Sequence, residues 1–119
     1  MLLERDGVDP DKPDEYDQTP LSCAAWNGYE GVVKILLRRD DVHPNKPDKG
    51  GRTPLSLAAG DGHEGVMKIL LEWDDVDPDK PDGQGRTPLR WATLSGHDGV
   101  VKMLLRRDDV SPAKRRKLG

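Results

Sequence analysis

The acidic stretch Asp75-Val76-Asp77-Pro78-Asp79 is similar to the start of a calcium-binding loop, because alternating carboxylates can supply oxygen ligands to a divalent cation. An EF-hand loop also requires glycine at its sixth position and glutamate at its twelfth, where this chain has Lys80 and Arg86. We therefore expect these aspartates to cap turns and to be hydrated, and we predict no metal site.

Histidine and cysteine are the other residue types that could carry chemistry. His63 and His97 stand 34 residues apart, at matching positions that stacked units would hold about 10 Å from each other, too far to ligate one metal ion. We interpret them as structural groups bonded near helix starts. Cys23 has no matched base, and no nucleophile, zinc or phosphate-loop motif is present. We predict that the chain is not an enzyme and binds no cofactor.

The elements that would position any site repeat along the chain. Thr19-Pro20-Leu21 recurs as Thr53-Pro54-Leu55 and as Thr87-Pro88-Leu89, a period of 34 residues. One such unit has too little apolar surface to form its own core, so it must stack on its neighbours. The period therefore predicts a small solenoid.

Each copy predicts two helices and an arm. In the middle copy Thr53 is a good N-cap and Pro54 suits the first helical position. Gly62 is a C-cap candidate, and His63 precedes a second helix with apolar residues at helical spacing, followed by a proline- and glycine-rich link with a turn at its tip. We divide the chain into a partial repeat at 1–18, repeats at 19–52, 53–86 and 87–112, and a basic tail at 113–119.

Composition agrees with a thin shared core. Hydrophobic residues make up 34% of the chain and charged residues another 34%, and phenylalanine is absent. No apolar run approaches the roughly 18 residues of a membrane span, and no secretory signal follows Met1. With a single cysteine, this favours an intracellular, cytoplasmic protein.

The charges are unevenly placed. Residues 1–18 carry a local charge of −5 and residues 102–119 a local charge of +5. These are either solvated ends or charges that attract another copy or steer a partner. The run Lys114-Arg115-Arg116-Lys117 is similar to a nuclear-import signal. Without an aromatic stacking platform beside it, we do not expect nucleic-acid binding.

The pattern resembles the ankyrin repeat, whose motif is matched three times in register across residues 2–112. In the middle copy the matches are Asp48, Gly51, Thr53, Pro54, Leu55, Ala58, Ala59, Gly62, His63, Val66, Leu70, Leu71, Asp75 and Val76. The resemblance implies an all-α solenoid of stacked helix-turn-helix pairs linked by extended β-turn arms. It also implies a non-catalytic scaffold that binds a protein on a concave face made of arm tips and first helices.

Three departures from the family motif affect these expectations. The histidine after Thr-Pro-Leu is replaced by Ser22, Ser56 and Arg90, so the tie between repeats that it provides in the family is weakened or rebuilt. The glycine that ends the second helix is missing. Asp17 stands where the other arms have Gly51 and Gly85, so the first turn is expected to differ in shape.

The residues that differ among copies define the predicted contact surface. Trp26 is expected to face the groove, and its counterparts are Gly60 and Leu94. Trp91 is expected nearer the seam between repeats, and Trp73 on the outer side. Exposed variation on a constant framework is typical of a recognition surface, although neutral drift would produce it as well. The predicted contact residues are Trp26, Asn27, Asp48, Lys49, Arg52, Asp61, Asp82, Gln84, Arg86, Arg90, Leu94 and Ser95.

Two functions are compatible with this pattern. The first is reversible binding of another protein with an acidic or mixed-charge patch, with positive charge from Arg52, Arg86 and Arg90 and negative charge from Asp48, Asp61 and Asp82. The second is a segment of a longer array that acts in spacing or self-assembly, with weak end-to-end stacking through its open ends.

Overall fold

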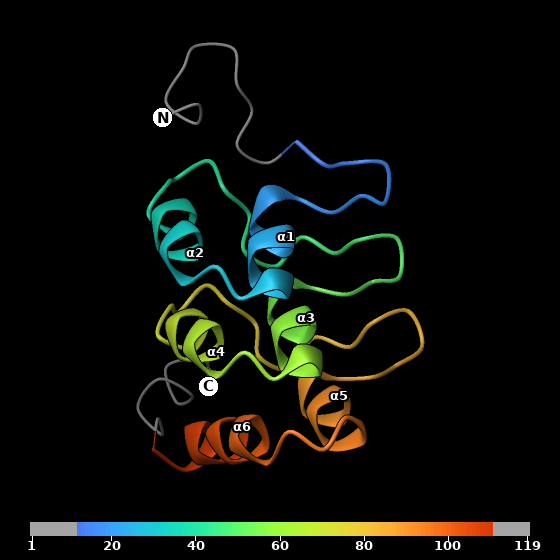
Figure 1. The fold of residues 1–119 in the computed structure, drawn as a ribbon, viewed down its shortest axis with the longest axis vertical. Helices are drawn as coiled ribbons and strands as arrows, with labels where there is room; N and C mark the ends of the chain where they lie inside the picture. The colour runs from blue at the N-terminus through green and yellow to red at the C-terminus, as the bar shows by residue number, and fades with distance from the viewer. Residues whose placement is uncertain (1–11, 111–119) are drawn as a thin grey trace, which may run out of the picture.

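The computed structural model describes residues 12–110, with side chains to residue 106. Six helices lie in this part of the chain, and no strand is found there. They are α1 (Pro20–Asn27), α2 (Glu30–Leu37), α3 (Pro54–Asp61), α4 (Glu64–Leu71), α5 (Pro88–Leu94) and α6 (Asp98–Val110). The helices stack as three pairs, with a long arm before each pair (Figure 1). The predicted all-α solenoid is confirmed.

The first helix of each pair begins as the Thr-Pro pattern predicts. The hydroxyls of Thr19, Thr53 and Thr87 accept hydrogen bonds from the backbone N–H three residues later, at 3.1, 3.2 and 3.2 Å. Such a cap stabilises a helix by about 1 kcal/mol. Proline follows each cap, where the helix needs no N–H donor.

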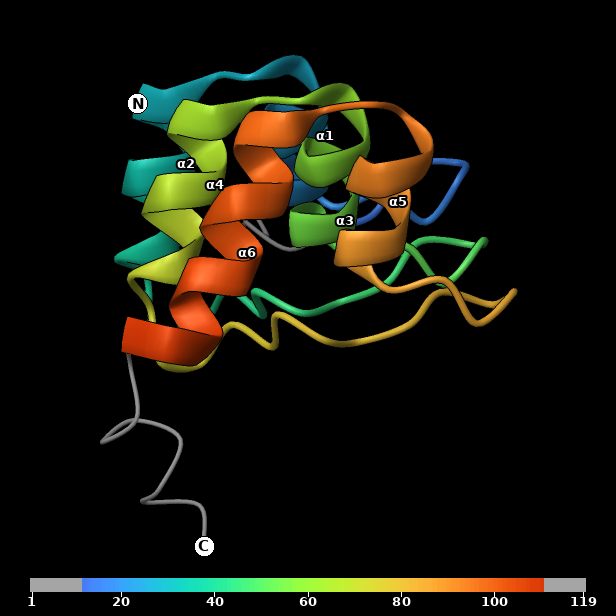
Figure 2. The same cartoon turned by 90° about the horizontal axis from the view of Figure 1, so that it is seen from below.

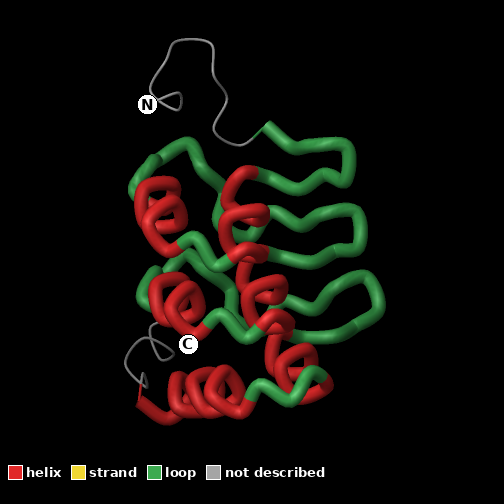
Figure 3. Tube along the Cα trace, in the orientation of Figure 1, coloured by secondary structure: helices red, strands yellow, loops and turns green. Residues whose placement is uncertain are grey.

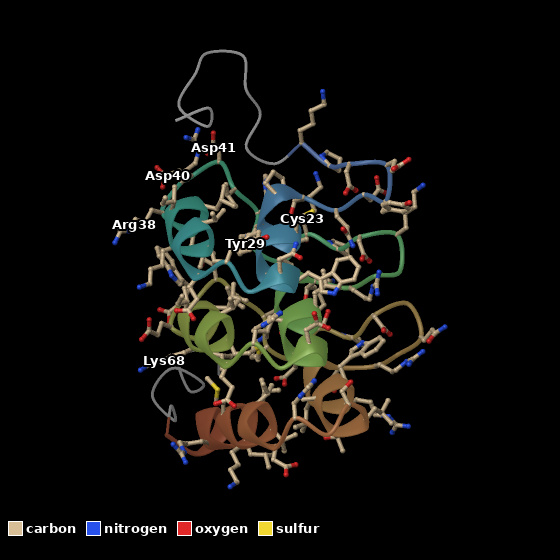
Figure 4. All side chains as sticks on the ribbon, in the orientation of Figure 1. Cys23, Tyr29, Arg38, Asp40, Asp41 and Lys68 are labelled. Atoms are coloured by element: carbon tan, nitrogen blue, oxygen red, sulfur yellow. The ribbon has the colours of Figure 1, made fainter. Side chains whose placement is uncertain are left out.

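The helix ends differ between the two rows. Gly28 and Gly62 end α1 and α3 in the left-handed conformation, as predicted. Helix α5 ends one residue earlier, at Leu94, and the left-handed Gly96 follows its C-cap Ser95. Helix α2 ends at Leu37, and its C-cap Arg38 has a right-handed helical backbone conformation, which agrees with the predicted loss of a glycine cap. Charged residues, including Asp40 and Asp41, crowd this end of α2 (Figure 4).

The core is a thin layer between two rows of helices. Helices α1, α3 and α5 form one row, and α2, α4 and α6 form the other (Figure 2). Small residues such as Ala25 and Ala59 let the first row pack closely, while Leu36 and Leu70 fill the space toward the second row. All four are fully buried, so each pair depends on its neighbours for a closed core.

Histidines tie successive repeats together. His63 Nε2 lies 2.8 Å from the carbonyl oxygen of Trp26, and His97 Nε2 lies 3.1 Å from that of Gly60. A side chain at Gly28 or Gly62 would collide with these imidazole rings. Their interpretation as structural histidines near helix starts is confirmed. Successive repeats are therefore tied through the histidine before the second helix, a position at which the sequence keeps the motif.

The arms project beside the first row of helices and contain no helix (Figure 3). Their tips are joined by backbone hydrogen bonds from Lys49 N–H to Tyr16 O, at 3.2 Å, and from Gly83 N–H to Gly50 O, at 2.8 Å. These bonds keep the three arms in register with the helix stack.

The expected change of shape in the first arm is wrong. Asp17 has a φ of 61°, in the same left-handed region as Gly51 at 78° and Gly85 at 80°. The turn hydrogen bond from residue 17 to Asp14 O also matches the bond from Gly51 to Asp48 O. Aspartate tolerates this conformation better than most residues with a side chain, so the same turn forms without glycine.

Candidate partner-binding surface

The predicted contact residues come from two kinds of element. One group lies on or at the end of the first-row helices: Trp26 and Asn27 on α1, Asp61 on α3, Arg90 and Leu94 on α5, and its C-cap Ser95. The other group lies in the arms: Asp48, Lys49, Arg52, Asp82, Gln84 and Arg86. All except Asp48 and Asp82 are exposed or half-buried. We call this surface, over α1, α3, α5 and the arms, the arm–helix face.

A pocket of about 200 Å³ lies at the middle of this face. Gly60 lines this pocket, at a position where the neighbouring repeats carry Trp26 and Leu94. We call this pocket the Gly60 notch; its lining residues are Trp26, Arg52, Ser56, Leu57, Gly60, Asp61 and Trp91. The missing side chain in the middle repeat thus leaves a hollow between two indole rings.

Arg52 holds one side of the notch. Its guanidinium forms a salt bridge of 3.0 Å with Asp48 and lies 5.9 Å from the centre of the Trp26 ring. The other carboxylate oxygen of Asp48 accepts the N–H groups of Gly50 and Arg52, both at 2.9 Å. The arm therefore fixes the cation that contacts Trp26, which itself remains 40% exposed.

Asp82 and Arg86 hold the other side of the notch. The Trp91 indole N–H donates a 2.9 Å hydrogen bond to Asp82, and the Arg86 guanidinium lies 4.8 Å from the ring centre. Burial acts to raise the pKa of Asp82, but the N–H groups of Arg86, Gln84 and Trp91 together outweigh it, so the pKa lies below its usual value. The anionic carboxylate thus anchors Trp91.

The expectation that Asp48 and Asp82 present negative charge to a partner needs correction. Both side chains are buried, and their oxygens are occupied by backbone N–H groups and by Arg52 or Trp91. Their role in the structure is to shape the arm turns and orient the side chains around the notch. Among the three predicted acidic contacts, Asp61 is the one that remains exposed.

A second depression is formed by the third arm and α5. It has a volume of about 500 Å³ and is lined by Gln84, Gly85, Arg86, Arg90 and Leu94. We call it the Arg90 depression. Four predicted contact residues meet here, and no carboxylate lines it. Three predicted contact residues that are exposed line neither hollow: Asn27, Lys49 and Ser95. The Asn27 amide instead donates a 2.7 Å hydrogen bond to the Cys23 carbonyl oxygen.

Trp91 is the functional side chain that the sequence interpretation left out of its contact set. Its expected place near the seam is confirmed, because its ring packs beside Gly60 of the preceding repeat. The signal in the sequence was the glycine at position 60, where the neighbouring copies have large side chains. Trp73, which was expected on the outer side, is half-buried and packs against the core.

The residues first considered for chemistry have structural partners. The Asp77 side chain accepts the N–H of Asp79 at 2.9 Å, which is the turn role expected for these aspartates. Burial, with the charge and hydrogen bond of Asp14, raises the pKa of the Cys23 thiol, which disfavours a reactive thiolate. Cys23 lies on α1 (Figure 4).

Among the described side chains, those of residues 12–106, no group of three or more histidine, cysteine, aspartate or glutamate residues is placed to hold a metal ion. In the same part of the chain, each helix is too short or too polar to cross a bilayer. The basic run at 114–117 and most of the partial repeat at 1–18 lie outside the described residues.

Comparison with known proteins agrees with the geometry. The family model described as ankyrin repeats in three copies matches residues 41–115. A second model, described as ankyrin repeats in many copies, matches residues 2–58. No curated protein matches the chain.

Proposed function

This chain belongs to the ankyrin repeat family, whose repeats are generally protein–protein interaction modules, and we propose that it binds another protein through the arm–helix face. The support is the arrangement of the Gly60 notch, in which buried aspartates in the arms orient Arg52 and Trp91. Side chains held in place before binding lose little entropy in a complex, which raises affinity.

The variation among copies also supports this proposal. The caps and the core repeat, whereas the residues around the notch and the Arg90 depression change from copy to copy. Exposed tryptophan and arginine are the residue types that most often dominate binding energy at protein interfaces. The partner would be a protein with an acidic or mixed-charge surface, and the module itself would be non-catalytic.

The test is to select binding peptides or proteins from a displayed library and to measure their affinity for variants by calorimetry. Replacing Trp26 and Arg86 together with alanine should weaken binding by about tenfold or more while the melting temperature changes little. The double variant Lys34→Ala/Lys68→Ala changes exposed residues on α2 and α4 and should bind normally. Unchanged affinity of the Trp26/Arg86 variant would remove this face from consideration.

End-to-end association is a second candidate function, favoured by the edge of the first repeat. Val32 and Ile35 are 40% and 42% exposed, whereas their counterparts Val66 and Ile69 are buried against the preceding repeat. Gly31 has open space around it, whereas Gly65 lies against the Glu30 carboxylate. At the opposite edge Leu105 is 49% exposed. These residues would extend the same packing into a second copy.

Light scattering over a range of protein and salt concentrations tests this association. Salt-sensitive oligomers that disappear in Ile35→Glu, but persist in the neighbouring exposed control Lys34→Glu, would support it. A monomer at every concentration would contradict it and leave the binding module as the better account.

We also propose that the protein is intracellular and cytoplasmic, with entry to the nucleus through Lys114-Arg115-Arg116-Lys117. Microscopy of a fluorescent fusion, with these four residues intact or replaced by alanine, tests the proposal. Equal nuclear signal in both forms would argue against an import role for the run.

A further inference from the structure

We propose that the Gly60 notch receives one large apolar side chain of an extended peptide, and that an acidic residue three positions away binds in the Arg90 depression. This inference rests on the proposed function, because it assigns the chemistry of the segment that the arm–helix face would bind.

The walls of the notch favour an apolar occupant. Trp26 and Trp91 supply two ring surfaces, and Leu57 and Gly60 also line the notch. The volume of about 200 Å³ compares with about 30 Å³ for one water molecule in the liquid, so the notch has room for an aliphatic side chain. An apolar side chain that displaces loosely held water from such a hollow contributes favourably to binding.

The charges around the notch disfavour a cationic occupant. Both rings already have a guanidinium against them, from Arg52 at 5.9 Å and from Arg86 at 4.8 Å. Asp61 is the one carboxylate that lines the notch, and it lies 3.5 Å from His63 Nε2. A lysine or arginine of a partner would therefore meet like charges on both sides.

The Arg90 depression favours an acidic residue. Arg86 and Arg90 both line it, and no carboxylate does. Arg90 is exposed and has no ion pair within residues 12–106. A carboxylate from a partner would supply the missing counter-charge.

The spacing of the two hollows sets the spacing in the peptide. The notch is centred on α3 and the depression on α5, which are adjacent helices in the first row. Packed helices lie about 8–10 Å apart, and an extended peptide advances about 3.3 Å per residue. Three residues therefore span the distance, in either direction along the stack.

The probe is the synthetic peptide Glu-Ser-Gly-Leu-Gly-Ser-Glu, whose symmetry satisfies both directions. Binding is followed by two-dimensional NMR of the indole N–H groups of the full chain. Trp26 and Trp91 line the notch, whereas Trp73 packs against the core elsewhere, so three signals report the location of binding. The peptide should shift the signals of Trp26 and Trp91 and leave that of Trp73 in place.

Gly60→Leu is the decisive variant, because leucine is already present at the equivalent Leu94. A Cβ at this position would lie 3.5 Å from the Trp91 ring, an ordinary contact, so the variant should fold. It should bind the peptide about tenfold more weakly or not at all. Gly31→Ala, on an open part of α2, controls for the higher helix propensity and should bind as the parent does.

Peptide variants separate the two halves of the proposal. Replacing both glutamates with lysine, or the leucine with serine, should each lower affinity by about tenfold. Stronger binding of a peptide with central lysine would overturn the apolar assignment. If the parent peptide binds Gly60→Leu as tightly as the unaltered chain, or shifts no indole signal, the notch inference fails. The proposed function is tested separately, with library-selected partners and the Trp26/Arg86 variant.

Discussion

The indole nitrogen of Trp91 lies 2.9 Å from a carboxylate oxygen of Asp82, so a ring on α5 is held by the arm that precedes the helix. The second carboxylate oxygen accepts the N–H groups of Gln84 and Arg86, both at 2.9 Å. The buried Asp82 side chain therefore stabilises the arm turn and also orients the Trp91 ring. The position of Trp91 in the notch depends on the arm.

Asp82→Asn is expected to separate these two roles. Asparagine keeps an oxygen for the turn, but its amide nitrogen cannot accept the Trp91 indole N–H. We expect a loss of about 1–2 kcal/mol in the free energy of unfolding, measured by urea denaturation, together with a shifted Trp91 indole signal. In Asp77→Asn, which changes an exposed turn aspartate of the same arm, the loss should stay below about 0.5 kcal/mol. Equal losses in the two variants would contradict the anchoring role.

The same pair predicts a dependence on pH. The pKa of Asp82 is lowered in the folded chain, below the value of about 3.9 for an unfolded aspartate. Its contribution to stability is therefore fully present above about pH 4 and is lost as the pH falls through the folded-state pKa. The difference in unfolding free energy between the parent and Asp82→Asn should shrink when measured from about pH 7 down to about pH 2. A constant difference would argue that the charge of Asp82 is unimportant.

The turn at Asp17 predicts opposite effects of two exchanges. Asp17→Gly should raise the free energy of unfolding by about 0.5 kcal/mol, because glycine adopts the left-handed conformation without steric cost. Gly51→Asp should lower it by at least about 1–3 kcal/mol, since a Cβ there would lie 2.5 Å from the backbone nitrogen of Gly83. Chemical denaturation of both variants checks the prediction, and effects of the same sign would refute it.

The ties between repeats can be tested at a matched position. His63→Ala removes the hydrogen bond to the Trp26 carbonyl oxygen and should lower the free energy of unfolding by about 1 kcal/mol. Amide hydrogens of the first repeat should also exchange with solvent faster than in the parent. Tyr29 precedes α2 at the position that His63 has before α4, but Tyr29 is 59% exposed. Tyr29→Ala should therefore cost less than His63→Ala, and the reverse order would show that the histidine bond contributes little.

The sequence could predict those features of the fold that depend on residues close in the chain or on the 34-residue period. The Thr-Pro starts, the glycine ends and the stacking followed from local caps and from the 34-residue period. The burial of Asp48 and Asp82 could not be predicted, because each carboxylate turns inward only when the complete arm brings N–H groups around it. The notch was also missed, since it requires the Trp91 ring of one repeat to lie beside Gly60 of another.

Each helix pair in the described chain packs mainly on the pair before it and the pair after it. A mechanical load applied along the stack would therefore be carried by the interfaces between successive repeats, which lie in series. Trp26, Gly60 and Trp91 belong to three successive repeats, so separation at either interface would open the Gly60 notch. A peptide bound in the notch would contact more than one repeat, so its affinity would fall under tension.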